Sequence, residues 1–149
     1  IDMGGKVLSF ATYSKKTFEG NGHTISNFKL AYNLSDASLE ANFDNGSQNA
    51  VYVCLFKEIA NSTIQNVNFK GVQLVIEGEF SKAQYVYVAP LCMSATGATV
   101  KNVTFELTYQ IVGLPIGDST TFELSGDGYR QKDEASNFEG FDITINEIK

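Results

Sequence analysis

The sequence predicts an all-β fold, a right-handed parallel β-helix of about four coils with loops inserted between them. Two observations lead to this prediction. The chain contains internal repeats rich in β-branched and aromatic residues. Amphipathic helical periodicity is nearly absent across its 149 residues. Stacked coils are the architecture in which short repeats of this kind bury one another, and parallel crossovers are right-handed as a general rule.

One repeated segment carries threonine, a β-branched residue, a polar residue, asparagine and an apolar residue in that order. It occurs three times, as HTISNFKL at 23–30, STIQNVNF at 62–69 and ATVKNVTF at 98–105. This alignment makes Asn27, Asn66 and Asn102 equivalent, with spacings of 39 and 36 residues. Strands of successive coils pair in register, so equivalent residues form columns along the stack.

The columns predict which side chains fill the interior and which form the bends. We expect two inward apolar columns, one of Ile25, Ile64 and Val100 and one of Phe28, Val67 and Val103. Asparagine tolerates the left-handed conformation, and its amide can bond to the asparagine stacked on it. We therefore predict a structural asparagine ladder at the bends, with Asn102 buried.

Two further alignments support the repeat. VYVCLFKEIAN at 51–61 matches VYVAPLCMSAT at 86–96, and FKGVQLVIE at 69–77 matches FEGFDITIN at 138–146. Polar insertions separate the repeats at about 31–50, 77–84 and 112–135. We expect residues 1–149 to form a single domain, a segment of a larger protein.

Composition and charge exclude several classes of function. Hydrophobic residues make up 43% of the chain and charged residues 19%, which is typical of a packed fold. The net charge is −6 and the basic residues are scattered, which argues against a nucleic-acid partner. No apolar run approaches the roughly 18 to 20 residues that span a membrane.

Neither a metal nor a cofactor is predicted. The single histidine, His23, and two cysteines are too few for a structural zinc site. NFDNGSQN at 42–49 does not match a twelve-residue calcium loop. The alignment offsets Cys54 from Cys92 by about three residues and one coil, beyond the roughly 7 Å limit for a disulfide. We expect two free thiols.

Catalysis is not expected either. His23 lies in a glycine-rich turn without a nucleophile motif nearby. Paired carboxylates are the stronger enzymatic alternative, because inverting glycosidases hold two carboxyl groups about 6.5 to 9.5 Å apart on a rigid face. The candidates lie on polar insertions and are Asp36, Glu40, Asp44, Asp118, Asp127 and Asp133.

Tyrosines offer a candidate binding surface. Tyr85 and Tyr87 alternate with valines, and Tyr52 is the repeat mate of Tyr87. If the valines face inward, Tyr52 and Tyr87 form an exterior ladder suited to a glycan or a protein partner. Tyr109 lies near the third insertion. A cross-strand pair that only stabilises the sheet is the alternative.

FEGNGHTISNFKL, VYVCLFKEIANSTIQNVNFKGVQL and VYVAPLCMSATGATVKNVTF resemble GLUG-type repeats of bacterial β-helix domains in the pectate-lyase-like superfamily. The resemblance covers about residues 1–30, 50–76 and 85–111. The sequence departs from the repeat where glycines are expected, with Cys54 and Lys57 in one unit and Ala89 and Cys92 in the next. The resemblance implies an adhesin-like protein that is secreted or anchored at the cell surface.

The sequence thus favours a non-catalytic structural and interaction module of a secreted or surface-anchored bacterial adhesin-like protein. Its partner would be a protein or glycan on a cell surface, and open coil ends would allow self-association. The alternative is a carbohydrate-binding or carbohydrate-active domain related to lyases or hydrolases. That alternative requires a groove where aromatic or acidic side chains gather.

Overall fold

A computed structural model describes residues 1–33, 40–41, 49–77, 85–109 and 121–148, and these residues form strands and turns without a helix. None of them forms a helix able to cross a membrane. The strands are β1 (Asp2–Val7), β2 (Phe10–Ser14), β3 (Thr17–Asn33), β4 (Glu40–Ala41), β5 (Asn49–Ala60), β6 (Thr63–Glu77), β7 (Tyr85–Thr96), β8 (Thr99–Tyr109), β9 (Thr121–Leu124), β10 (Tyr129–Lys132) and β11 (Asn137–Glu147).

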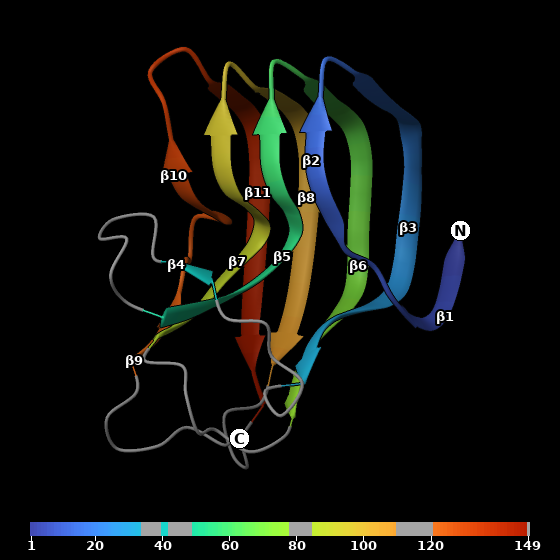
Figure 1. Cartoon of the computed structure of the whole chain (residues 1–149). Helices are drawn as coiled ribbons and strands as arrows, with labels where there is room; N and C mark the ends of the chain where they lie inside the picture. The colour runs from blue at the N-terminus through green and yellow to red at the C-terminus, as the bar shows by residue number, and fades with distance from the viewer. Residues whose placement is uncertain (34–39, 42–48, 78–84, 110–120, 149) are drawn as a thin grey trace.

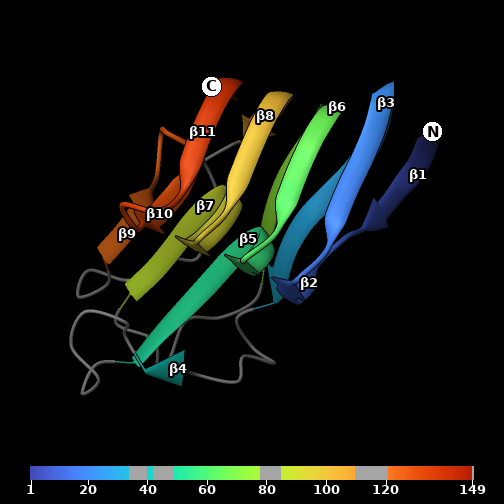
Figure 2. The ribbon, with the colours of Figure 1, turned by 90° about the horizontal axis from the view of Figure 1, so that it is seen from above.

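The strands form two sheets with parallel pairing. The five-stranded sheet has the order β1-β3-β6-β8-β11, and all of its pairs are parallel. The six-stranded sheet has the order β10-β7-β5-β2, with β9 parallel to β7 and the short β4 antiparallel to β5. Figures 1 and 2 show the strands of each sheet side by side in this order. The all-β class and the parallel pairing agree with the prediction.

The chain alternates between the sheets. A strand of the six-stranded sheet leads through a short turn into a strand of the five-stranded sheet, in the pairs β2–β3, β5–β6, β7–β8 and β10–β11 (Figure 1). We call these pairs units one to four. Each unit pairs with the next in both sheets.

Two of the repeat alignments describe the pairing between units two and three. Val51, Tyr52, Val53 and Cys54 lie opposite Val86, Tyr87, Val88 and Ala89. Thr63 to Phe69 likewise lies opposite Thr99 to Phe105. After Cys54 the pairing shifts by one residue, so that Phe56 pairs with Cys92. Pro90 lies in this irregularity, where a residue without an amide hydrogen interrupts the fewest ladder hydrogen bonds.

The alignment of the first repeat was wrong. Ile25 pairs with Phe69 instead of Ile64, and Asn27 lies level with Gly71 instead of Asn66. The cause is an irregularity between Glu19 and His23, where β3 has two more residues than β6. The residues that lie level with Ile64 and Val67 are therefore Phe18 and His23.

Two assignments in the last unit also need correction. FEGFDITIN at 138–146 pairs with residues 100–108, so it is equivalent to the segment from Ile64 onwards rather than to 69–77. Residues 121–132, predicted as part of an insertion, form β9 and β10 against β7. These two short strands are separated by a Gly-Asp-Gly turn. The alternation of apolar and polar residues within each is therefore too brief to predict a strand from the sequence.

The main core lies between the two sheets. Val51, Val53, Val86 and Val88 of the six-stranded sheet belong to it, with exposed fractions of 3% or less. From the five-stranded sheet, Phe28, Phe69 and Phe105 form an aromatic cluster with ring centroids 5.4 to 6.5 Å apart. Five of the six residues predicted to face inward belong to this core, and Ile25 packs against it. The partners of Ile25 and Phe28 differ from those expected, and the exposed His23 lies level with Val67.

Candidate functional site

A column of polar side chains follows the bend within the five-stranded sheet. Asn66 and Asn102 have the left-handed φ values of 55° and 53°. The Nδ2 of Asn102 donates a hydrogen bond of 3.2 Å to Oδ1 of Asn66, whose own Nδ2 donates to Glu19 at 3.0 Å. In unit four, Gly140 lies level with Asn102 and also has a positive φ, 64°. Side-chain hydrogen bonds thus connect Glu19 of unit one, Asn66 of unit two and Asn102 of unit three.

Asn27 belongs to a different bend. It has a φ of 57° and lies level with Gly71, whose φ is 63°. The ladder therefore joins Asn66 and Asn102 only. The predicted burial of Asn102 was also wrong, because Asn102 is exposed, as is Asn27, and Asn66 is half-buried. Asparagine serves these bends by tolerating positive φ rather than by satisfying buried backbone groups.

Glu19 ends the ladder, and its carboxylate makes stability depend on pH. Hydrogen bonds from Asn66, the Asn21 amide and Gln65 lower the pKa of Glu19 below its ordinary value of 4.5. A carboxylate with a lowered pKa in the folded state stabilises the fold above its ordinary pKa, and this contribution is lost as the pH falls through the folded value.

We expect Glu19→Gln to weaken the loss of stability below about pH 4.5. Urea midpoints measured from neutral to acid pH check this. The matched control is Glu139→Gln, which removes an exposed carboxylate of unit four that lies level with Lys101 of β8. If the urea midpoint of Glu19→Gln falls at acid pH as much as that of the unsubstituted chain, Glu19 has no such role.

Three of the four candidate tyrosines gather on the outer face of the six-stranded sheet. The rings of Tyr52 and Tyr87 stack at 5.7 Å and those of Tyr85 and Tyr87 at 5.5 Å. The neighbouring valines point into the main core, as the alternation predicted. Tyr109 lies apart, half-buried at the end of β8 against the main core. Burial, and secondarily Glu147, raises the pKa of Tyr109.

The tyrosine ladder is not the exposed surface that the sequence predicted. Tyr52 and Tyr87 are only 8% and 4% exposed, in a small cluster with Ala50, Ala89 and Met93. The guanidinium of Arg130, from β10, lies 3.9 Å from the centroid of the Tyr87 ring. Sequence alternation places the rings on the outer face but carries no information about Arg130, which is more than 40 residues away.

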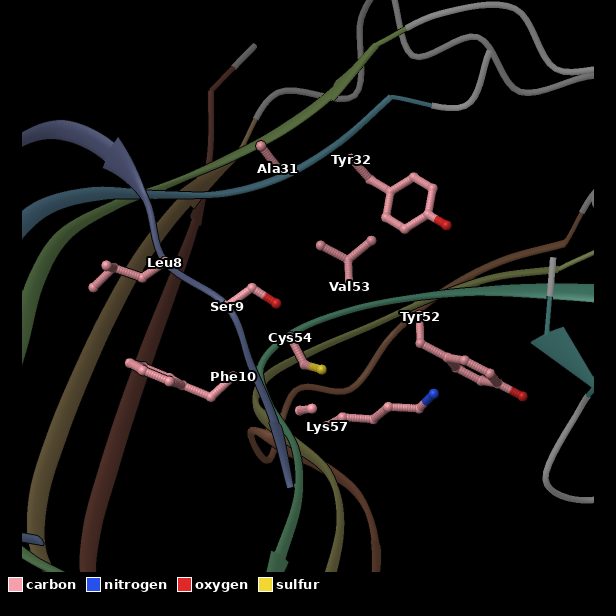
Figure 3. A pocket seen from close by; sticks show the side chains of 10 residues that line it. Leu8, Ser9, Phe10, Ala31, Tyr32, Tyr52, Val53, Cys54 and Lys57 are labelled. Carbon is pink, nitrogen blue, oxygen red and sulfur yellow. The ribbon is translucent and has the colours of Figure 1, made fainter. Parts of the chain in front are cut away.

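A hollow of about 430 Å³ opens beside this cluster, where β2 and the end of β3 approach β5. Tyr32 and Val53 lie on one side of the β5 ribbon, and Tyr52, Cys54 and Lys57 lie on the other (Figure 3). Ser9 and Phe10 complete the rim. Aromatic rings, a hydroxyl and an ammonium group around one hollow can hold a polar ligand with a flat apolar face.

The candidate acids do not form a catalytic pair within the described residues. Asp36, Asp44 and Asp118 lie outside these residues, as does the side chain of Glu40. Asp127 lies in the turn that precedes β10 and Asp133 directly follows β10, and the extended chain from Tyr129 to Asp133 alone spans about 13 Å. Inverting glycosidases require about 6.5 to 9.5 Å.

Asp133 has a structural role in the turn between β10 and β11. It accepts hydrogen bonds from the Gly97 amide at 3.1 Å and from the Ser136 hydroxyl at 2.6 Å, and these bonds lower the pKa of Asp133. The buried Ser136 in turn accepts from the Ala98 amide at 3.0 Å. Ser62 likewise accepts from the Lys16 amide at 3.1 Å.

These turn serines were missed by sequence reasoning. Their only signal is a serine directly before the strand in two units, at Ser62 and Ser136. His23 is exposed in β3. Within the described parts of the chain, no group of three or more His, Cys, Asp and Glu side chains is placed to hold a metal.

Both cysteines are free thiols, as predicted. Burial, with a smaller effect from Cys54, raises the pKa of the Cys92 thiol, so that thiolate formation there is suppressed. We expect a thiol reagent at pH 8 to modify the half-buried Cys54 about tenfold or more faster than Cys92. Peptide mapping after partial labelling measures both rates, and denatured chain is the control. Equal rates in the folded chain would contradict the burial of Cys92.

Comparisons with protein families, with curated proteins and with solved structures found no match to this chain.

Proposed function

We propose that this chain is a stretch of right-handed parallel β-helix that serves as a non-catalytic structural and interaction module of a secreted or surface-anchored bacterial protein of the adhesin-like type. The register between units carries the proposal. Columns such as Phe18, Ile64, Val100 and Phe138 continue through all four units at the same level. Continued columns are what a coiled solenoid produces, and right-handed crossover is the rule for parallel strands.

The use of the polar side chains supports a structural role. Glu19 and Asp133, two of the carboxylates with lowered pKa, bond to neighbouring units. Each therefore holds one unit on the next. The extracellular setting is supported by the resemblance of residues 1–30, 50–76 and 85–111 to GLUG-type repeats, which occur in surface proteins.

A pair of assays on the purified chain tests this function. We expect saturable binding to a protein from a cell surface or extracellular matrix, with no release of reducing ends from soluble polysaccharides. The Lys57→Ala variant, which alters the lining of the hollow, is assayed beside the unsubstituted chain as the control for any polysaccharide cleavage. Polysaccharide cleavage by the unsubstituted chain that the Lys57→Ala variant loses would overturn the non-catalytic assignment.

The hollow favours carbohydrate binding as a second candidate function. Tyr32 offers a ring, and Lys57 and Ser9 offer hydrogen-bond donors to hydroxyl groups of a sugar. We expect oligosaccharide titration by NMR to shift the signals of these residues, and Tyr32→Ala to weaken binding about tenfold. Lys70→Ala, an exposed lysine of β6 that does not line the hollow, is the control. A screen in which no sugar shifts these signals would exclude this candidate.

A further inference from the structure

The hollow of about 430 Å³ that Tyr32 and Lys57 line reaches the space between the two sheets. Val53, on its inner side, is only 3% exposed and belongs to the main core. Leu8 and Tyr32 also line the hollow, and both pack against the same core. Tyr32 and Val53 lie on one side of the β5 ribbon (Figure 3). The apolar side of the hollow is therefore continuous with the interior of the protein.

This hollow forms where the chain crosses from β1 in one sheet to β2 in the other. Val7 pairs with Lys29 in the five-stranded sheet. Phe10 already pairs with Phe56 in the six-stranded sheet, so that only two residues make the crossing. Both β3 and β5 extend past this crossing. The crossing is one wall of the hollow, and β3 and β5 supply the other walls.

The opposite side of the hollow carries a positive charge. Cys54 and Lys57 lie across the β5 ribbon from Val53 (Figure 3). Of the described residues that line the hollow, Lys57 alone is charged. The chain as a whole has a net charge of −6, but exposed charges more than about 10 Å away are largely screened at moderate salt. The ammonium group of Lys57 therefore favours an anionic group of a ligand at this side.

We propose that the hollow binds an amphipathic carboxylate, a molecule with one carboxylate and a short unbranched hydrocarbon chain. Its carboxylate pairs with the ammonium group of Lys57, and its hydrocarbon chain lies against Leu8, Ala31 and Val53. The inference goes beyond the proposed function, because a structural and interaction module needs no small molecule. It also differs from the carbohydrate candidate, since sugar hydroxyl groups lose their hydrogen bonds to water on an apolar surface.

The apolar side supplies most of the expected affinity. Each methylene group that leaves water strengthens binding about fourfold. The volume of the hollow lies within the range of about 300–1,000 Å³ that is typical of small-molecule sites. An ion pair with Lys57 adds less, because water screens it at the open side. The hydrocarbon chain thus provides the affinity, and the carboxylate decides which end of the ligand enters.

Cys54 reports whether the hollow is occupied. It lines the hollow and is half-buried, whereas Cys92 is buried and lies outside the lining. The probe is octanoate, used below the concentration at which it forms micelles. We expect saturating octanoate to slow the modification of Cys54 by a thiol reagent about fivefold or more, because the bound molecule keeps the reagent out. The slow modification of Cys92 should not change.

Two related molecules separate the contributions of the head and the chain. Acetate has the carboxylate without the hydrocarbon chain, so it should not protect Cys54 at the same concentration. Octylammonium has the same chain with a positive head, which Lys57 repels, and it should not protect Cys54 either.

Three variants test the two sides of the hollow. Lys57→Met keeps an unbranched side chain without the charge, and Ala31→Leu fills the apolar side. Each should raise the octanoate concentration needed for half-maximal protection about tenfold. Lys57 is not buried, so Lys57→Met tests the site even if Ala31→Leu destabilises the fold. Lys70→Met removes the charge of an exposed lysine that does not line the hollow, and should leave this concentration unchanged.

Protection of Cys54 by octanoate that Lys57→Met weakens and Lys70→Met retains would support the proposal. No protection by octanoate, equal protection by acetate or octylammonium, or full protection in Lys57→Met would overturn it. Protection by a neutral oligosaccharide but not by octanoate would also overturn it, and would favour the carbohydrate candidate instead.

Discussion

Phe105→Ala is expected to lower the free energy of unfolding by about 3–5 kcal/mol, which is typical of a large aromatic residue removed from a packed core. Phe105 is fully buried, and its ring centroid lies 5.4 Å from that of Phe69 and 6.5 Å from that of Phe28. The pairing of β8 with both β6 and β11 leaves little freedom for these strands to close the cavity. Urea denaturation monitored by circular dichroism measures the change.

Two control variants make this result specific to the core. Phe105→Leu retains most of the volume and should cost less than about 1.5 kcal/mol. Phe10→Ala removes the same ring from a residue that is 47% exposed, so its cost should be clearly smaller. Equal costs for Phe105→Ala and Phe10→Ala would contradict a core between the two sheets.

Gly20→Ala has the second large expected effect, about 1–3 kcal/mol or more, because the added carbon meets the backbone of the neighbouring strand. A Cβ at Gly20 would lie 2.4 Å from the carbonyl oxygen of Asn66 and 2.6 Å from the Cβ of Val67. Both strands would have to move apart at the irregularity that sets the register of β3. Thermal or urea unfolding of the variant measures the cost.

Two other glycines serve as a matched series. Gly22 has a positive φ of 78° and open space around its Cβ position, so Gly22→Ala should cost about 1 kcal/mol from backbone strain alone. Gly126 has open space and no positive φ, so Gly126→Ala should be close to neutral. A Gly20→Ala cost no larger than that of Gly126→Ala would refute the close approach of β3 and β6.

Sequence repeats predicted the pairing where successive units have the same length. Residues 63–69 and 99–105 differ by substitutions only, so their alignment is also their register. The alignment failed where a unit gains residues at a bend. The extra residues between Glu19 and His23 moved Asn27 from the predicted column to the column of Gly71. A repeat search that favours ungapped identity cannot detect this shift, because several positions share the same asparagine-containing pattern.

Features that depend on distant contacts were also beyond the sequence. Alternation placed Tyr52 and Tyr87 on the outer face correctly, but their burial depends on neighbours such as Met93 and Arg130. Asn102 was predicted to be buried, yet its bend lies at the surface. The hollow beside Tyr32 and Lys57 joins residues from separate strands, and no local motif marks it.

The most direct test of this fold is the register between β3 and β6. Nuclear Overhauser effects in an isotopically labelled sample measure this register. We expect contacts between Ile25 and Phe69 and between Phe69 and Phe105, with the backbone pattern of parallel strands. A contact between Ile25 and Ile64, or a pattern of antiparallel strands, would contradict it.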